Sequence, residues 1–435
     1  MDLATLFQAH LAERQRSAEE ALARAGYDAL VISSGEVFTY FADDQDAPFH
    51  PTPHFAHWCP MEGPHHLLVV RPGRRPRLIR YAPEDFWYEQ LPLGSPFWAA
   101  GFEIEEAGTV EDAWERLGSL PRAAYIGNEA GRATAAGLDA NPALLTAHLD
   151  WTRSYKTDYE LQCIEEATVL GARGHLAAKA AFLAGASELE IHHAYVQAVG
   201  CLDQELPYPS IVALNEKGAT LHYEGKRTLK KGFTMLIDSG AQVRGYAADI
   251  TRTITAPHCD GRFSALVAGM EKVQRELCAA VHPGMPYGDL HHLGHLRIAG
   301  LLQENGLLKA DPEEAVEQGL SRPFFPHGLG HHLGIQVHDV AGRQLGPDGT
   351  PAPPPPQHPF LRTTRMIEAG QVFTVEPGLY FIPMLLRPFR ENEHRDRFDW
   401  ELIDALTPCG GIRIEDNLFV IPEGSRNLTR KHLPN

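Results

Sequence analysis

The first part of the chain alternates helical and strand-like patterns of apolar residues. A charged helical pattern opens the sequence and ends at Gly26. Short apolar runs typical of strands follow it, namely YDALVISSG, HHLLVV and PRLIRYA. The alternation continues to AAYIGNEAG at residues 123–131. We therefore predict a mixed α/β domain over residues 1–154.

The remaining 281 residues, 155–435, contain longer helical patterns between short apolar runs. Thr157 or Asp158 can cap one helix, and Ser187 with Glu190 forms a capping box for the next. Two further helical patterns follow, one through residues 266–277 and one over 289–304. A chain of 435 residues is too long for one ordinary core, so this part is expected to be a second domain.

Two apolar runs, MLIDSG and GYAADITRTIT, predict a β-hairpin with its turn near Val243 and Arg244. Such a hairpin sets Asp238 roughly opposite Asp249, with Cβ atoms about 4.5–5.5 Å apart. Two metal ions in a hydrolytic site lie about 3.5–4 Å apart. Each aspartate can therefore bind one ion, or both aspartates can bind the pair of ions. Taken alone the signal is weak, because an aspartate beside a glycine turn is usually solvated.

A glycine-rich segment, PHGLGHHLGIQVHDVAG at residues 326–342, contains four histidines. Its glycines argue against a helix. A straight strand would place His331 and His338 on opposite faces and about 23 Å apart. A bend, for which Gly334 is the obvious place, would bring both to one site. The alternative is that these histidines are merely exposed in a loop.

Two glutamates stand in apolar strand-like runs, VFTVEPGLY and GIRIEDNLFV. Glu376 ends a buried run, and Pro377 and Gly378 after it predict a turn. Glu415 shares a strand face with Arg413, and a charge on so apolar a strand needs a partner. Either glutamate could instead be an edge-strand charge or a member of a salt bridge.

Together these residues offer four carboxylates and one imidazole, a ligand set suited to two divalent cations. Without metal, two like charges 4 Å apart repel by about 4 kcal/mol at an effective dielectric constant of about 20. Several such pairs would threaten a fold whose net stability is about 5–15 kcal/mol. We therefore predict a dinuclear metal-dependent hydrolase. Manganese is favoured, with cobalt, zinc or iron as alternatives. The predicted ligands are Asp238, Asp249, His331, Glu376 and Glu415.

Composition narrows the function classes. Lys and Arg total 39 against 56 Asp and Glu, a formal net charge of −17 that disfavours nucleic-acid binding. The six cysteines have no metal-binding spacing and are expected to be free thiols in a reducing compartment. The sequence contains no signal-peptide pattern and no apolar stretch of about eighteen residues. We expect a soluble cytoplasmic protein without a membrane partner.

Four motifs in this order and spacing resemble those of the pita-bread metallopeptidases: DSGAQVRGYAADITRT, HGLGHHLGIQVHDVAG, TVEPGLY and GIRIEDN. Within that family the chain is similar to bacterial Xaa-Pro dipeptidases, whose relatives include organophosphorus acid anhydrolases. The likeness runs from FADD near the start to the last strand. It implies an α+β protein with a C-terminal pita-bread catalytic domain at residues 155–435 and a smaller α/β domain at 1–154.

The resemblance implies roles for the residues around the metals. The five ligands would hold two ions, with Asp249 and Glu415 touching both. His222 and His338 match histidines that flank the metals and steady the substrate and its tetrahedral intermediate. His327 matches a further active-site histidine.

It also implies substrate-binding residues. Arg362, fourteen residues before Glu376, matches the arginine that binds the substrate's terminal carboxylate. Tyr208 matches a pocket tyrosine. Asp44 begins a long loop that in the relatives reaches the partner's active site, which implies a homodimer. Residues 351–359 are expected to be a surface insertion.

The expected reaction is hydrolysis of the imide bond in dipeptides that end in proline. A hydroxide bridging the ions would attack the carbonyl, Glu376 would pass the proton to the proline nitrogen, and His338 or His222 would stabilise the oxyanion. We also expect a side activity on organophosphate triesters. The alternatives are an aminopeptidase P, which would not need Arg362 as a clamp, and a pita-bread binding module without catalysis. A methionine aminopeptidase would not need the first 150 residues.

Overall fold

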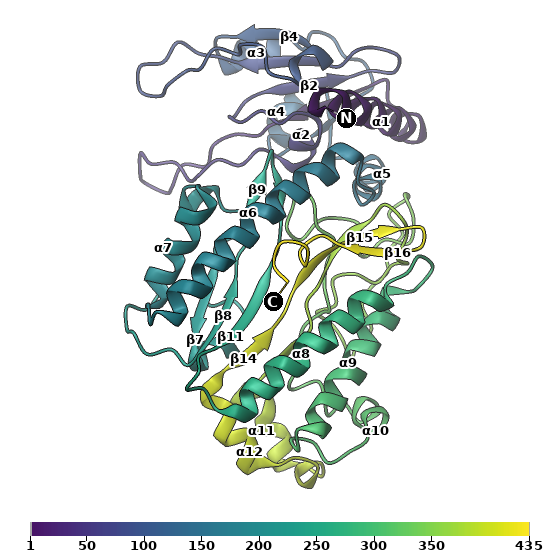
Figure 1. Ribbon diagram of the computed structural model, residues 1–435. Coiled ribbons are helices and arrows are strands. Elements are labelled where there is room, and N and C mark those ends of the chain that lie inside the picture. Colours follow the sequence, from purple (N-terminus) through teal and green to yellow (C-terminus); the bar gives the residue numbers. More distant parts are fainter. Residues whose placement is uncertain (1, 435) are drawn as a thin grey trace. The chain divides into compact units, whose positions relative to one another are not determined.

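The computed structural model describes residues 2–434, and the chain divides into two compact units (Figure 1). Unit 1 consists of Met1–Gln162 with Leu345–Thr350, and unit 2 of Cys163–Gln344 with Pro351–Asn435. None of the helices in the described residues combines the length and apolar character that a bilayer crossing requires.

Unit 1 is built on one mixed sheet of six strands in the order β4-β3-β2-β1-β5-β6. The strands are β1 (Ala29–Ser33), β2 (Leu67–Val70), β3 (Arg77–Tyr81), β4 (Glu103–Ala107), β5 (Ala123–Ile126) and β6 (Asp139–Ala140). The helices are α1 (Leu3–Ala25), α2 (Pro53–Trp58), α3 (Val110–Glu115), α4 (Ala130–Ala135) and α5 (Ala143–Arg153), with a 3-10 turn at Ala99–Gly101. Helix α1 ends where Gly26 adopts φ 81°, as the sequence predicts.

Unit 2 contains most of the longer helices. They are α7 (Glu188–Val199), α8 (Gly261–Ala280), α9 (Tyr287–Glu304), α10 (Pro312–Glu317), α11 (Pro383–Glu391) and α12 (Trp400–Leu406). Helix α6 (Asp158–Leu183) contributes its first residues to unit 1 and the rest to unit 2. The Thr157 hydroxyl accepts from the Glu160 amide at 3.4 Å, so Thr157 rather than Asp158 caps it. The capping box of Ser187 and Glu190 is present at α7.

The strands of unit 2 are short and antiparallel. They are β7 (Ile211–Leu214), β8 (Thr234–Asp238), β9 (Gln242–Val243), β10 (Tyr246–Ala247), β11 (Thr251–Thr255), β12 (Val372–Val375), β13 (Gly378–Tyr380), β14 (Gly411–Arg413), β15 (Asp416–Ile421) and β16 (Gly424–Asn427). Short 3-10 turns occur at Asp203–Glu205, Asn215–Ala219, Arg395–Arg397 and Thr407–Cys409.

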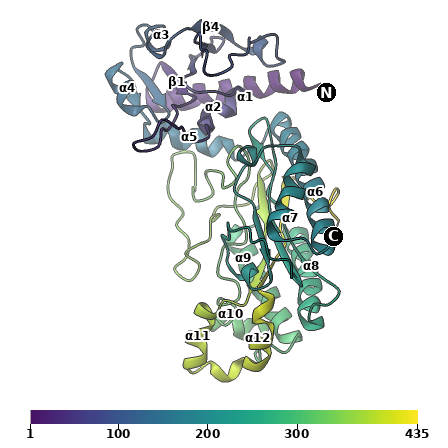
Figure 2. The ribbon, with the colours of Figure 1, turned by 90° about the vertical axis from the view of Figure 1, so that its left-hand side faces the viewer.

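Helices of unit 2 pack against these strands through two apolar cores. One core joins α6 and α7 to β7 and β8 through residues such as Phe182, Val212 and Ile237. The other joins α8 and α9 to β12–β15, with Leu266 and Phe373 among its members. Figure 2 shows α6, α7 and α8 together on one side of the strands. The helices therefore bury the apolar side chains of the sheet, which is the α+β arrangement that was expected.

Candidate metal centre

A row of directly paired positions crosses the strands of unit 2. Asp238, the last residue of β8, pairs with Thr251, the first residue of β11. Thr251 pairs in turn with Glu415, and its hydroxyl donates to the Glu415 carboxylate at 2.7 Å. Residues paired directly across antiparallel strands have side chains on the same face. Both carboxylates therefore emerge on one face of the sheet.

Glu376 extends this row. Strand β12 pairs with β15 and strand β13 with β14 in one continuous register, which sets Glu376 opposite Glu415 in the gap between the two ladders. The turn expected at Pro377 and Gly378 is wrong, because β13 begins at Gly378 and continues the same ladder. Proline has no N–H to donate, so it interrupts the pairing without reversing the chain.

The hairpin that contains the two aspartates differs by two residues from the one expected. Its two-residue turn is Arg244 and Gly245, both with positive φ (52° and 84°), as a type I′ turn requires. Asp238 is consequently paired with Thr251 and not with Asp249. Asp249 stands two residues before Thr251 and shares its face, so the carboxylates still converge.

His331 comes from an irregular segment that runs antiparallel to β12. The Thr374 amide donates to the His331 carbonyl at 2.9 Å, and the Glu376 amide donates to the Leu329 carbonyl at 2.8 Å. Gly330 allows this approach, since a Cβ there would lie 2.0 Å from the Thr374 carbonyl oxygen. The segment from His327 to His331 is not helical, as its glycines predict.

The side chains of the five predicted ligands meet at this face. His331 Nε2 lies 3.5 Å from Asp249 Oδ2 and 3.6 Å from Glu376 Oε1. Potential ligand atoms of Asp249, His331 and Glu415 all lie within 4.8 Å of one another. The hydroxyl of Tyr208 is within hydrogen-bonding distance of Asp249 and lies 2.9 Å from Asp238.

Arg413 is a member of the site that the sequence did not single out. Its guanidinium donates to Asp238 at 2.6 Å and to the Tyr380 hydroxyl at 2.9 Å. The same hydroxyl lies 2.9 Å from His327 Nε2, so His327 is connected to the carboxylates through Tyr380. The available signal was the strand alternation that places Arg413 on the face of Glu415.

Burial and mutual repulsion perturb the carboxylates. Burial raises the pKa of Glu376 to about 7. Burial, followed by repulsion from Asp249 and Glu376, raises the pKa of Glu415 well above its usual range. Burial also raises the pKa of Asp238, although Arg413 opposes it. Burial is also the largest single effect on Asp249 and acts in the same direction, but the hydrogen bond and charge of His331 and the hydrogen bond of Tyr208 together outweigh it, so the pKa of Asp249 is lowered.

This arrangement fits divalent cations. Glu415 Oε1 is buried, and no described residue gives it a hydrogen bond. A buried polar atom without a partner is rare in native structures. The donor set is oxygen-rich with one imidazole, and Arg413 is the one arginine paired with its carboxylates among residues 2–434. Cations would therefore satisfy both the free oxygen and the excess negative charge.

The other predicted residues lie at different places. The rings of His331 and His338 have centroids 4.4 Å apart, so the chain bends between them as expected. His222 and Arg362 are exposed. Burial, followed by Arg413, lowers the pKa of His327 to about 3, and His222 and Arg362 act in the same direction. Asp44 is exposed in unit 1, on the turn after Asp43.

Four carboxylates, two of them buried, gathered around a buried imidazole on an α+β scaffold are typical of metal-dependent hydrolases. The sequence model of metallopeptidase family M24 matches residues 162–422, and that of the Xaa-Pro dipeptidase N-terminal domain matches residues 5–151. The Xaa-Pro dipeptidase of Pseudoalteromonas atlantica is 44% identical over 98% of each chain, and that of Pectobacterium atrosepticum is 46% identical over 98% of each. The chain belongs to metallopeptidase family M24, in the group of the Xaa-Pro dipeptidases.

Solved structures agree on the fold. Aminopeptidase P from E. coli gives a TM-score of 0.74 at 23% identity, covering 97% of this chain and 95% of that one. Proline aminopeptidase P II from Yersinia pestis gives 0.73 at 22% identity, covering 97% and 96%. At such identities the likeness shows the fold alone. The predicted fold, a pita-bread catalytic domain with a smaller N-terminal domain, is confirmed.

Proposed function

We propose that this metallopeptidase hydrolyses the imide bond of dipeptides with proline at the C-terminus. The observation that supports it most is the convergence of five potential ligands on one sheet face, in a chain similar over almost its full length to Xaa-Pro dipeptidases. The ligands would be Asp238, Asp249, His331, Glu376 and Glu415. When bound, two divalent cations, with manganese favoured, would polarise the scissile carbonyl and lower the pKa of a coordinated water.

Glu376 is the best candidate to hold and move the proton. Burial raises its pKa to about 7, which suits a group that accepts and returns a proton near neutral pH. The departing proline nitrogen must be protonated to leave. Bound cations would favour the ionised carboxylate, so Glu376 would hold that proton only transiently. We assign Glu376 as general base and acid.

Two histidines are candidates to stabilise the developing oxyanion. His338 lies against His331 and is exposed. His222 is also exposed. A donated hydrogen bond that strengthens as charge develops lowers the barrier. His327 would instead position Tyr380 and, through it, Arg413.

Arg362 is proposed to bind the substrate carboxylate. Its guanidinium is exposed, and its backbone packs closely against Gly328 and Gly342, at 3.3 and 2.6 Å from where a Cβ of either would lie. A guanidinium holds a carboxylate through two parallel hydrogen bonds. Fixing the chain end in this way would restrict cleavage to dipeptides. Tyr208 would orient Asp238 and Asp249 through its hydroxyl, and Asp44 would reach the active site of the partner subunit in a homodimer.

The deciding experiment compares Ala-Pro with Ala-Pro-Ala. We expect fast cleavage of the dipeptide and little of the tripeptide. R362A should raise KM for Ala-Pro and reduce the difference in cleavage rate between Ala-Pro and Ala-Pro-Ala. The exposed Arg387 on α11 provides a matched control, since R387A should leave both rates unchanged. Equal rates on the two peptides by the wild type would favour aminopeptidase P activity instead. No cleavage of either peptide would favour a binding module.

Three further proposals accompany this function. A nucleophile that attacks a carbonyl carbon can also attack phosphorus, so we propose a side activity on organophosphate triesters. If no aryl alcohol is released in a metal-dependent way from a panel of aryl phosphotriesters, that proposal is wrong. We also propose a homodimer in the cytoplasm, which size-exclusion chromatography with light scattering and cell fractionation would test.

The domain boundary between residues 154 and 155 stays a prediction.

A further inference from the structure

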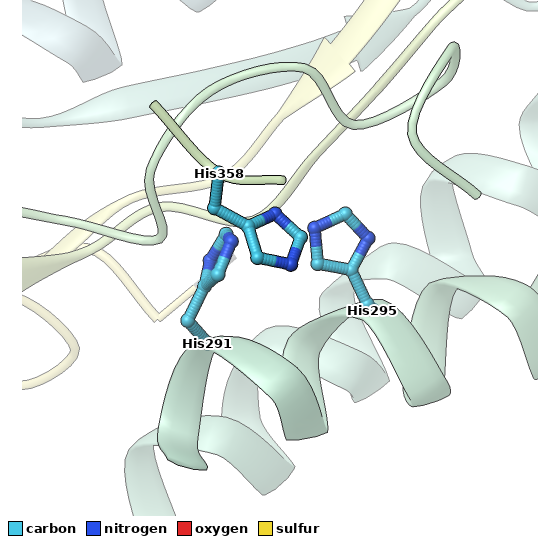
Figure 3. A group of neighbouring side chains, drawn as sticks. All are labelled: His291, His295 and His358. Atoms are coloured by element: carbon cyan, nitrogen blue, oxygen red, sulfur yellow. The ribbon is translucent and has the colours of Figure 1, made fainter. Parts of the chain in front are cut away.

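Three imidazoles of unit 2 form a second cluster that shares no residue with the carboxylate site. His291 and His295 lie on α9, and His358 lies in the loop of residues 351–359 (Figure 3). Their potential ligand nitrogens all lie within 4.8 Å of one another. The ring centroids are 4.5 Å apart for His291 and His358, 4.7 Å for His295 and His358, and 4.8 Å for His291 and His295.

The local sequence explains why these rings meet. His291 and His295 are four residues apart, so they project from the same face of α9, as Figure 3 shows. His358 reaches them from a proline-rich loop, where its amide donates to the Pro355 carbonyl at 2.9 Å. The loop was expected to be a surface insertion, and it brings a third imidazole to a buried helix face.

The ring nitrogens of the two helical histidines have few partners. His291 is 2% exposed, and neither of its ring nitrogens has a hydrogen bond to any described residue. His295 is 1% exposed; its Nδ1 lies 2.9 Å from the Ser321 hydroxyl, whereas its Nε2 has no partner within residues 2–434. Buried polar atoms are nearly always hydrogen-bonded. We therefore expect these nitrogens to bind a ligand.

We propose that His291, His295 and His358 form a mononuclear site for a divalent transition metal, with Zn²⁺ as the best fit. Zinc takes imidazole nitrogens at about 2.0–2.1 Å in tetrahedral geometry, which sets ligand nitrogens about 3.3 Å apart. The nitrogens, now within 4.8 Å of one another, would have to come closer to reach that spacing. An all-imidazole set suits zinc, copper or nickel, in contrast to the oxygen-rich set of the carboxylate site.

The surroundings of the rings suit metal ligation. Burial lowers the pKa of His291 to about 3 and that of His358 to about 4, so the rings are neutral and their lone pairs are available. If the His295 Nδ1–H donates to Ser321, Nε2 is left to bind the metal, the usual arrangement around a ligating histidine.

A small cavity lies on the His358 side of the cluster, and neither His291 nor His295 is among the residues that line it. This cavity of about 30 Å³ is lined by His358, Arg322, Phe325 and Phe360, among others. That volume accommodates a water molecule. The positive charge of Arg322 favours an anion or a hydroxide in this position over a neutral donor.

The site would fasten the loop of residues 351–359 to α9. Arg362 follows His358 by four residues, so the metal would also restrict the segment that precedes the proposed carboxylate clamp. This consequence for substrate binding rests on the proposed function, whereas metal binding itself does not. The histidines would be positioning residues, and their loss should raise KM for Ala-Pro more than it lowers kcat.

The test is the number of zinc ions bound per chain. Protein stripped with a chelator is reloaded with Zn²⁺, passed over a desalting column and analysed by mass spectrometry of the metal. We expect three ions for the wild type and two each for H358Q and H295Q. The exposed neighbour His292 on α9 gives the control, and H292Q should keep three. The double variant D249N/E415Q, which damages the carboxylate site, should retain the imidazole-bound ion.

Cobalt provides an independent readout. Co²⁺ in a tetrahedral imidazole site absorbs visible light more strongly than in an oxygen-rich six-coordinate site. That absorption should appear in the wild type and in D249N/E415Q and be absent from H358Q, whose substitution in a half-exposed loop position is the least disturbing of the three. The proposal is overturned if the wild type binds no more than two ions, or if H358Q still binds three. The cluster would then be aromatic packing around Phe325 only.

Discussion

Glu376 and Glu415 face each other across the gap between two antiparallel ladders that share one register. Both carboxylates lie on the same face of the sheet, Glu415 buried at 1% exposure and Glu376 partly buried. Two buried like charges at facing positions are unfavourable unless one is protonated or cations lie between them. The backbone pairing alone places these two carboxylates opposite each other. The sheet therefore favours a ligand of positive charge at this position.

Replacing Glu415 by Gln should affect the metal-free and the metal-loaded protein in opposite directions. The substitution removes a buried charge that burial and neighbouring carboxylates disfavour, so the metal-free protein should melt at a higher temperature. Loss of a ligand should reduce turnover of Ala-Pro by more than about 100-fold, since even residues that only orient ligands cost about 10–100-fold. Thermal melts with and without Mn²⁺ check both effects.

The exposed Glu423, in the turn before β16, is the matched control, and E423Q should leave both melting temperatures and turnover unchanged. A lower melting temperature for metal-free E415Q would show that Glu415 is stabilised by protein contacts rather than strained by repulsion.

Truncating Arg413 should destabilise the metal-free protein strongly. R413M leaves the partly buried Asp238 without its cation at 2.6 Å, and breaking a buried ion pair costs up to about 3–5 kcal/mol. Bound cations would replace part of the lost positive charge, so the cost should be smaller after loading with metal. Urea unfolding of both forms measures the difference. R426M, which removes an exposed ion pair with Glu165, is the control and should cost little in either form. An equal cost in both forms would mean that Asp238 does not bind metal.

Local signals in the sequence were enough for much of the fold. The capping box at Ser187, the helix end at Gly26 and the bend between His331 and His338 each depend on residues close in sequence, and each is present. These features follow from side-chain chemistry and backbone preferences of a few neighbouring residues.

Features that depend on pairing between distant strands were missed or misplaced. The hairpin turn lies at Arg244 and Gly245, one residue beyond the expected centre, because a non-glycine residue at φ 52° is not apparent from its type. Pro377 and Gly378 are residue types that favour turns. The pairing of β12 with β15 before them and of β13 with β14 after them keeps the chain extended. The partner of Arg413 is Asp238, 175 residues away, which periodicity cannot reveal.

Acid should weaken unit 1 through His66, which is 4% exposed. Its Nδ1 accepts the Tyr81 amide at 3.0 Å, so the ring must be neutral there, and burial lowers its pKa from 6.5 to about 4. The folded state therefore binds fewer protons than the unfolded state between these pH values. The stabilisation is fully present above pH 6.5 and is lost as the pH falls toward 4. The loss amounts to about 3 kcal/mol.

Hydrogen exchange of β2 and β3 at pH 7.5 and 5.0, corrected for intrinsic exchange rates, would measure the part of this loss that occurs above pH 5. H66N keeps an acceptor near the Tyr81 amide without a titrating ring, so its protection should vary less with pH than that of the wild type. The exposed His50 supplies the control variant H50N. An unchanged pH dependence in H66N would assign the effect to another histidine, such as the buried His10.

The approach of the His331 segment to β12 should depend on Gly330. A Cβ at this position would lie 2.0 Å from the Thr374 carbonyl oxygen and 2.4 Å from the Tyr287 hydroxyl, and the first contact is with backbone that has no room to yield. G330A should cost about 1–3 kcal/mol or more, as overpacking does, and should move His331 away from Asp249. Manganese affinity and turnover should then fall together, measured by calorimetry and the Ala-Pro assay. G288A, in α9, meets no atom within 4 Å and should be neutral or slightly stabilising. Full metal affinity in G330A would show that His331 reaches its ligand position without this close contact.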